Sequence, residues 1–235
     1  MFNYQNDTSN SRNLPEIDTE RRAIDSVIAF LNKHLPNFPN IFKNKTSITP
    51  VDPEDDVSQI LWAYLERMAR KTEFFMIQFQ YRYFRTRRSS DFGIIEVEDN
   101  NPNEIDKAFF VIEAKRLPTP GKDKEGKSRE KEYVSSNYGG MERYKKGHHG
   151  KGLSDSAMIG YIQKDDCNHW HQKINDWIND LIKTNKSSEI CWDEDDLLIL
   201  EKDLKTTQKY NSKNTRIVTS NRDSIRIHHY LMELA

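Results

Sequence analysis

Apolar residues recur at helical spacing in three stretches of the chain. The first covers residues 19–35 and ends before Pro36, the second follows Pro53, and the third covers residues 170–183. Such spacing places the apolar side chains of each stretch on one face, which predicts three amphipathic helices that pack against a core. Asp52-Pro53 and the acids after it predict an N-cap, a proline at the first helical position and a favourable first turn.

Other apolar positions alternate or form short continuous runs, as β-strands do. Residues 74–84 are aromatic and alternating, residues 91–97 follow an arginine-rich turn, and residues 108–115 are mostly apolar. Strong turn signals between the last two segments predict an antiparallel hairpin with a long tip. Further strands are predicted at residues 156–163, 197–204 and 224–234, the last two separated by a polar loop that contains Arg216.

The order of these segments predicts the fold class. A fourth helix is expected over residues 133–146 despite the glycine pair 139–140, and a loop rich in glycine and lysine is expected at residues 118–131. Helices, a strand meander and then alternating helices and strands predict one α/β domain with a mixed central β-sheet flanked by helices. This domain would cover residues 18–235, with its core at about 52–165, after a polar arm at residues 1–17.

Composition narrows the class of protein without identifying a partner. The 235 residues carry a net charge of -1, and 11% are aromatic, which argues against disorder of the whole chain. Cys167 and Cys191 have no paired spacing, so neither a disulfide framework nor a cysteine zinc site is expected. No apolar run has transmembrane length and no signal segment is visible, which predicts a cytoplasmic protein without a membrane partner.

Charged residues stand where two of the predicted strands meet. Asp91 opens one strand, and Glu113 and Lys115 close the next. Residues i and i+2 of a strand share a face, so Glu113 and Lys115 are expected side by side, and antiparallel pairing brings Asp91 to them. Paired carboxylates with a free carbonyl bind cations such as Mg²⁺, which polarise a phosphate, while a nearby lysine orients or deprotonates the attacking water.

This pattern resembles the PD-(D/E)xK motif of restriction-endonuclease-like nucleases. The match consists of Ser90-Asp91 after a turn, a hairpin, and an apolar strand that ends in Glu113-Ala114-Lys115, and it covers about residues 54–163. Ser90 replaces the proline that is usual in the family. The resemblance implies a restriction-endonuclease-like core in which Asp91, Glu113 and the Ala114 carbonyl bind metal and Lys115 is the catalytic lysine.

Two flanking helices extend the resemblance. Many members carry a further acid on the helix before the hairpin; Glu54 occupies that place as a metal ligand, and Asp55 or Asp56 are the alternatives. Members also place a polar residue on the helix after the motif. The glutamine found in some members is absent here, which leaves three substitutes: Glu142, Arg143 and Tyr144.

The resemblance implies a nuclease that uses one or two Mg²⁺ or Mn²⁺ ions to hydrolyse phosphodiester bonds of DNA. It would act in restriction, phage defence or mobile-element biology, as a homodimer or within a larger defence complex. Two alternatives are a catalytically inactive nucleic-acid-binding or complex-forming domain with the same fold, and a structural subunit of a larger complex. Basic residues near the motif are expected to contact the nucleic-acid backbone: Arg85, Arg87, Arg88, Arg143, Lys145 and Lys146.

The remaining histidine and tryptophan clusters favour structural interpretations. His148-His149 lies between glycines and is interpreted as part of a flexible basic loop rather than a metal or proton-transfer site. Residues 166–171 gather metal-ligating types without a known spacing. In the last strand, one of His228 and His229 is expected to face the core and the other solvent. Residues 170 and 177 are both tryptophan, and this spacing indicates a packing stripe.

Overall fold

The computed structural model describes residues 19–44, 53–97, 107–122, 126, 128–135, 139–184, 190–217 and 223–234. The polar arm predicted at residues 1–17 and most of the tip of the predicted hairpin lie outside these ranges. Within the described residues, no helix combines the length and the apolar character needed to cross a lipid bilayer.

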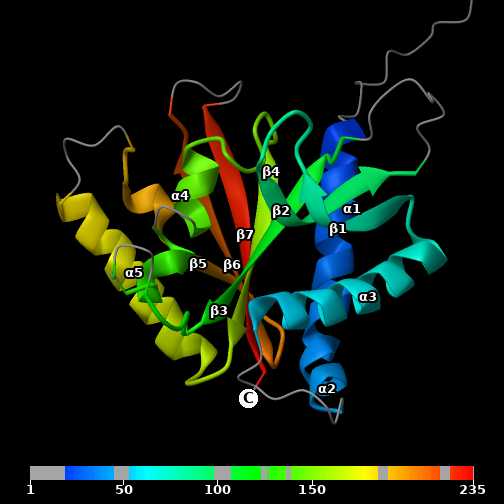
Figure 1. Cartoon of the computed structure of the whole chain (residues 1–235), viewed down its shortest axis with the longest axis horizontal. Helices are drawn as coiled ribbons and strands as arrows, with labels where there is room; N and C mark the ends of the chain where they lie inside the picture. The colour runs from blue at the N-terminus through cyan, green and yellow to red at the C-terminus, as the bar shows by residue number, and fades with distance from the viewer. Residues whose placement is uncertain are drawn as a thin grey trace, which may run out of the picture.

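A seven-stranded mixed sheet forms the centre of the molecule (Figure 1). The strand order is β1-β2-β3-β4-β7-β6-β5, in which β3–β4 and β4–β7 are parallel and the other neighbours are antiparallel. The predicted mixed sheet and the β2–β3 hairpin are therefore confirmed. The strands are β1 (Phe75–Arg82), β2 (Ser89–Glu96), β3 (Phe110–Leu117), β4 (Asp155–Ile162), β5 (Ile199–Asp203), β6 (Thr207–Thr215) and β7 (Ser224–Glu233).

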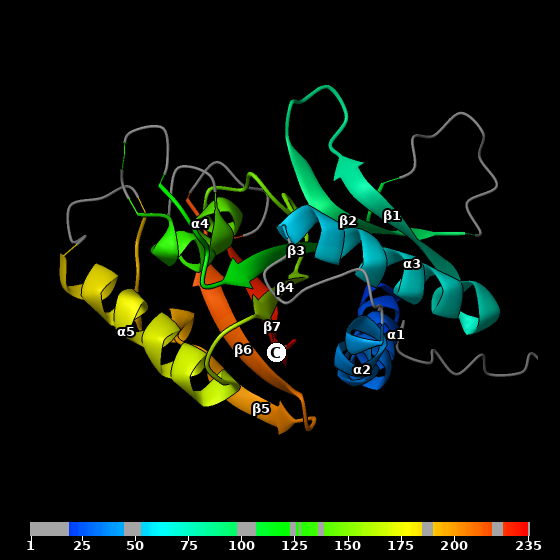
Figure 2. The same ribbon diagram turned by 60° about the horizontal axis from the view of Figure 1, so that its bottom comes forward.

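Helices cover both faces of the sheet (Figures 1 and 2). One face carries α1 (Thr19–His34), the 3-10 turn η1 (Leu35–Asn37), α2 (Phe38–Lys43) and α3 (Glu54–Thr72). The other face carries η2 (Glu130–Tyr133), α4 (Gly140–Lys145), α5 (Cys167–Thr184) and η3 (Glu194–Asp196). Because the central strands are buried on both faces, β3 and β4 are almost continuously buried rather than alternating.

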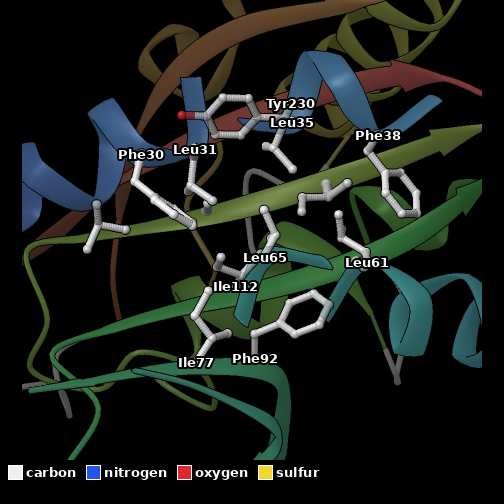
Figure 3. Packing of buried hydrophobic residues seen from close by; sticks show 14 of the residues in the cluster. Phe30, Leu31, Leu35, Phe38, Leu61, Leu65, Ile77, Phe92, Ile112 and Tyr230 are labelled. Carbon is white, nitrogen blue, oxygen red and sulfur yellow. The ribbon is translucent and has the colours of Figure 1, made fainter. Parts of the chain in front are cut away.

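The core between the sheet and α1–α3 depends on the helical spacing of apolar residues in these helices, and α3 is an example. Val57, Leu61 and Leu65 of α3 recur at four-residue spacing, and all three are fully buried. Burial of such side chains stabilises the fold by about 1.5–3 kcal/mol each. Figure 3 shows this packing through the following labelled residues: Phe30, Leu31, Leu35, Phe38, Leu61, Leu65, Ile77, Phe92, Ile112 and Tyr230.

The core on the opposite face contains the tryptophan pair of α5. Trp170 and Trp177 are 1% and 6% exposed, and their ring centroids lie 6.2 Å apart. The prediction of a packing stripe is confirmed. The two cysteines differ sharply: Cys167 is buried under this core and its Sγ contacts the Leu231 carbonyl, whereas Cys191 is exposed.

One short helix was not predicted, and two helix predictions need correction. Residues 38–43 form the short helix α2, which is not among the predicted helices; Phe38 and Phe42 are four residues apart on it and both are buried. Pro53 is the N-cap of α3 with extended backbone, so the helix starts at Glu54 rather than at the proline. The helix expected over residues 133–146 is reduced to α4, which begins at Gly140 with a positive φ of 59°.

The C-terminal region also differs from the prediction. The segment interpreted as a polar loop contains β6, which pairs with β7 along nine residues although it holds one apolar side chain, Tyr210. The two histidines of β7 do not divide between core and solvent. His228 and His229 are 3% and 0% exposed, because helices cover both faces of this strand.

Candidate functional site

The start of β2 and the end of β3 bring two acidic residues together. The two strands are antiparallel, and Phe92 pairs with Ile112, so that Asp91 continues the register opposite Glu113. Asp91 Oδ2 accepts a hydrogen bond of 2.6 Å from the backbone N–H of Ala114. Glu113 is 3% exposed, and Asp91 is partly buried. The fold therefore holds both carboxylates in a restricted position at one strand end.

The Lys115 ammonium lies between the acids of this strand end. Its Nζ is 3.1 Å from Glu113 Oε1, as expected for side chains two residues apart on one face. Nζ also donates to the Ala114 carbonyl oxygen at 2.8 Å and to Glu54 Oε1 at 2.9 Å. Lys115 is 5% exposed, so these contacts replace water as its hydrogen-bond partners.

The first residue of α3 completes this group. Glu54 Oε2 accepts the backbone N–H of Arg116 at 2.8 Å, while Oε1 contacts Lys115. Helix α3 therefore starts directly against the end of β3. Of the three acids considered for this place, Glu54 contacts the lysine, whereas Asp55 and Asp56 are exposed.

His149 is part of the site, which corrects its interpretation as a residue of a flexible basic loop. It is fully buried, and its Nδ1 lies 3.1 Å from Glu113 Oε2 and 3.0 Å from Ser90 Oγ. Gly147 and Gly150 have positive φ values of 63° and 56°, which turn the chain so that the histidine points inward. No residue spacing in the sequence indicates this contact, because it depends on the path of the loop.

Ser90, at the position where the motif that this chain resembles usually has proline, forms hydrogen bonds through its hydroxyl. The Ser90 hydroxyl contacts His149 and also lies 2.7 Å from the Tyr83 hydroxyl. Tyr83 in turn accepts the backbone N–H of Gly150 at 3.0 Å. A proline at position 90 could not make either hydroxyl contact. These hydrogen bonds join the β1–β2 turn, the start of β2 and the loop after α4.

The helix after the motif supplies a second cation to Glu113. Arg143 Nη1 lies 3.4 Å from Glu113 Oε1, and the arginine side chain is 28% exposed. Tyr144 is fully buried and donates to the Ala157 carbonyl, while Glu142 pairs with Lys146. Of the three substitutes considered for the polar residue on this helix, Arg143 is the one that contacts an acid of the site.

The two carboxylates of the hairpin have pKa values displaced in opposite directions. Burial acts to raise the pKa of Glu113, but Lys115, His149 and Arg143 outweigh it and hold this pKa at about 2. Burial and the adjacent Glu113 raise the pKa of Asp91 well above its ordinary value. Of these two acids, Asp91 is therefore the one whose charged form the fold disfavours.

Lys115 keeps its proton in this environment. Burial alone would lower its pKa, but the carboxylates of Glu113, Glu54 and Asp91 raise it well above 10.5. An ammonium held in this way donates hydrogen bonds and supplies charge. It does not act as the base that deprotonates a water molecule in this state of the site.

The donor types fit a hard divalent cation. Asp91, Glu113, Glu54 and the Ala114 carbonyl offer oxygen atoms, which are the ligands that such an ion prefers. In the described part of the chain, however, no three His, Cys, Asp or Glu residues are grouped closely enough to hold an ion. The Lys115 ammonium contacts two of these carboxylates and the carbonyl, so an ion would compete with it.

The basic residues expected to contact nucleic acid fall into two groups. Arg85, Arg87 and Arg88 are exposed on the turn between β1 and β2, and Lys146 is partly exposed. Lys145 is fully buried and forms a 2.5 Å ion pair with the equally buried Asp196. The expectation for Lys145 is therefore wrong, because α4 directs its ammonium into the protein.

No protein-family model, curated protein or solved structure matches this chain.

Proposed function

We propose that this chain is a metal-dependent nuclease of the PD-(D/E)xK type that hydrolyses phosphodiester bonds of DNA. The observation that carries the proposal is the convergence of Asp91, Glu113 and Lys115 at the end of β3, held by the 2.6 Å hydrogen bond from Ala114 to Asp91. A role in restriction, phage defence or mobile-element biology follows from the same resemblance.

The succession of elements around the motif supports this proposal. Helix α3 carries Glu54, strands β2 and β3 form the hairpin with Asp91 and Glu113, and α4 follows with Arg143. Each of these places matches the pattern of the family described above. The contacts of Lys115 with both Glu54 and Glu113 join the flanking helix to the hairpin motif.

In the proposed reaction, Asp91, Glu113, the Ala114 carbonyl and Glu54 are the groups that would hold one or two Mg²⁺ or Mn²⁺ ions. When bound, such an ion would polarise the phosphate and lower the pKa of a water ligand. Lys115 would orient the attacking water and stabilise negative charge on the phosphate, because its ammonium keeps its proton. Arg143, which is partly exposed beside Glu113, would contact the phosphate backbone.

Incubation of the purified chain with supercoiled plasmid DNA and Mg²⁺ or Mn²⁺ tests the proposal. We expect nicked or linear DNA from the wild type, and loss of cleavage by at least about a hundredfold in Lys115→Ala and Asp91→Ala. Glu54→Ala tests the contribution of the third carboxylate. Asp55→Ala is its matched control, because Asp55 is exposed on the same helical turn. Retention of full cleavage in Lys115→Ala and Asp91→Ala would refute the assignment.

A second candidate is a nucleic-acid-binding domain of the same fold without catalysis. Its support is that both oxygens of Glu113 already have cationic or histidine partners, namely Lys115, Arg143 and His149. This candidate predicts tight, salt-sensitive DNA binding with intact plasmid in the presence of either metal ion.

A further inference from the structure

A pocket of about 860 Å³ lies beside the candidate site, between the β1–β2 turn and the loop after α4. This volume is within the range of about 300–1,000 Å³ that is typical of small-ligand sites. Tyr81, Phe109 and Leu153 contribute apolar surface to its lining. The pocket is therefore large enough for a planar ring together with its attached groups.

An exposed aromatic ring stands in the wall of this pocket. Phe84 is 61% exposed, more than any other aromatic side chain in the described part of the chain. The Arg85 guanidinium lies 5.1 Å from the centroid of this ring. Water-exposed aromatic surface next to a guanidinium is the type of platform on which nucleobases stack.

Cations surround the pocket. Arg82, Arg85, Arg88, Lys107 and Lys151 line it, and none of the described residues in its lining is acidic. His148, also in the lining, has its pKa lowered to about 4 by burial and by the nearby cations, first among them Arg88. The described lining thus carries positive charge and no negative charge, which favours a ligand that carries negative charge.

Two segments connect the pocket with the candidate site. Tyr83 lines the pocket, and its hydroxyl contacts Ser90, the residue before Asp91. Gly150 lines the pocket as well, and it follows His149, which contacts Glu113. A ligand in the pocket would therefore be separated from Glu113 by the side chains of Tyr83 and His149.

We propose that this pocket receives one unpaired nucleotide of a nucleic-acid strand, with the base on Phe84 and the adjoining phosphates on Arg88, Lys107 and Lys151. The aromatic ring matches the base, and the cations match the phosphates on either side of it. That the strand is a substrate rests on the proposed function. Binding of the nucleotide in the pocket does not require catalysis. The unpaired nucleotide is expected because a stacked and paired base does not expose its ring faces.

Fluorescence anisotropy in EDTA tests the pocket without cleavage. Labelled duplexes that differ by one unpaired nucleotide are titrated with the wild type, Phe84→Ala and Arg88→Gln at constant salt. Arg87→Gln is the matched control for Arg88→Gln, because Arg87 lies on the same exposed turn but does not line the pocket. Ile199→Ala controls for Phe84→Ala, because Ile199 is 67% exposed on β5.

We expect the wild type to bind the duplex with the unpaired nucleotide about tenfold more tightly than the paired duplex, a difference of about 1.4 kcal/mol. Phe84→Ala and Arg88→Gln should remove this preference, and both controls should keep it. Equal binding of the two duplexes by the wild type, or an equal loss of this preference in Arg87→Gln and Arg88→Gln, would overturn the proposal. Displacement of the strand by an equal concentration of free nucleoside monophosphate would also overturn it.

The plasmid assay keeps the two proposals separate. Cleavage without a preference for the unpaired nucleotide would refute the pocket and leave the nuclease assignment in place. A preference that depends on Phe84 and Arg88, combined with intact plasmid, would support the pocket and favour the non-catalytic candidate.

Discussion

His149 Nδ1 lies 3.1 Å from Glu113 Oε2, and this contact joins the loop after α4 to the end of β3. The same ring nitrogen lies 3.0 Å from Ser90 Oγ. A buried glutamate oxygen that faces a histidine is held in one orientation, and its other oxygen remains turned toward Lys115. His149 therefore positions Glu113 within the proposed site.

Replacement of His149 by alanine should destabilise the protein and reduce cleavage. The change leaves Glu113 Oε2 and Ser90 Oγ buried without this partner, which costs about 1–3 kcal/mol. His149→Asn should recover part of the loss, because its amide can donate at a similar place. Urea unfolding and the plasmid assay measure both effects, with His169→Asn, at an exposed position of α5, as the control. An unchanged free energy of unfolding in His149→Ala would contradict the positioning role.

Replacement of Asp91 by asparagine should stabilise the protein while it abolishes cleavage. The pKa of Asp91 is raised in the folded state, so the folded protein binds this proton more tightly than the unfolded chain does. Its charge therefore lowers stability above the folded pKa, and this cost is relieved as the pH falls through that pKa. We expect Asp91→Asn to be more stable than the wild type at pH 7, by a margin that shrinks as the pH falls toward the ordinary pKa of an aspartate, measured by urea unfolding. A loss of stability at pH 7 would contradict the direction of this shift.

Replacement of Glu113 by glutamine should destabilise the folded protein at neutral pH, which is opposite to the effect expected for Asp91→Asn. The pKa of Glu113 is about 2, below its ordinary value of 4.5, so its charge stabilises the folded state above pH 4.5. This contribution is lost as the pH falls from 4.5 toward 2. Glu113→Gln should cost about 2–4 kcal/mol at pH 7 and much less near pH 2. A cost that does not change over this range would show that the charge of Glu113 is not its source.

Replacement of Lys115 by methionine should separate metal binding from cleavage. The ammonium occupies positions at Glu113 Oε1 and the Ala114 carbonyl that an ion would use. Its removal should raise Mn²⁺ affinity by about tenfold in calorimetry, because one competing charge is lost, while cleavage disappears. Lys71→Met, at an exposed position of α3, is the control. Weaker Mn²⁺ binding in Lys115→Met would contradict the proposed competition.

Replacement of Lys145 by methionine should destabilise the protein without any direct effect on DNA contacts. The change leaves the buried Asp196 carboxylate unpaired, at a cost of about 3–5 kcal/mol. Lys146→Met should cost less than about 1 kcal/mol, because its pair with Glu142 is partly exposed. Thermal unfolding and the salt dependence of DNA binding distinguish the two residues. A reduced salt slope in Lys145→Met that remains folded would contradict its burial.

The sequence predicts the hairpin motif well because its determinants are local. The apolar run before Glu113 fixes the strand, and the two-residue period of a strand then places Lys115 beside Glu113. The position of Asp91 opposite Glu113 follows from the antiparallel pairing of β2 and β3. The helical face of α3 is equally local, since Val57, Leu61 and Leu65 recur every four residues.

Features that depend on distant contacts could not be predicted in this way. Strand β6 reads as polar, and its buried Lys209 and Asn214 are hydrophilic residues that gain their environment from the neighbouring strands. Lys145 and Lys146 are adjacent and identical in type, yet the position of Asp196 decides which of them is buried. His149 reaches Glu113 through two glycine turns that carry no spacing signal.

The unequal burial of the two cysteines has a practical consequence for optical measurements. Burial raises the pKa of the Cys167 thiol far above its usual range, so this sulfur is protected from alkylating reagents at neutral pH. Cys191 is exposed and precedes η3, which lies with β6 toward the edge of the sheet opposite β1 and β2. A single maleimide dye would thus label the wild-type chain at one defined point away from the hairpin, without any engineered residue.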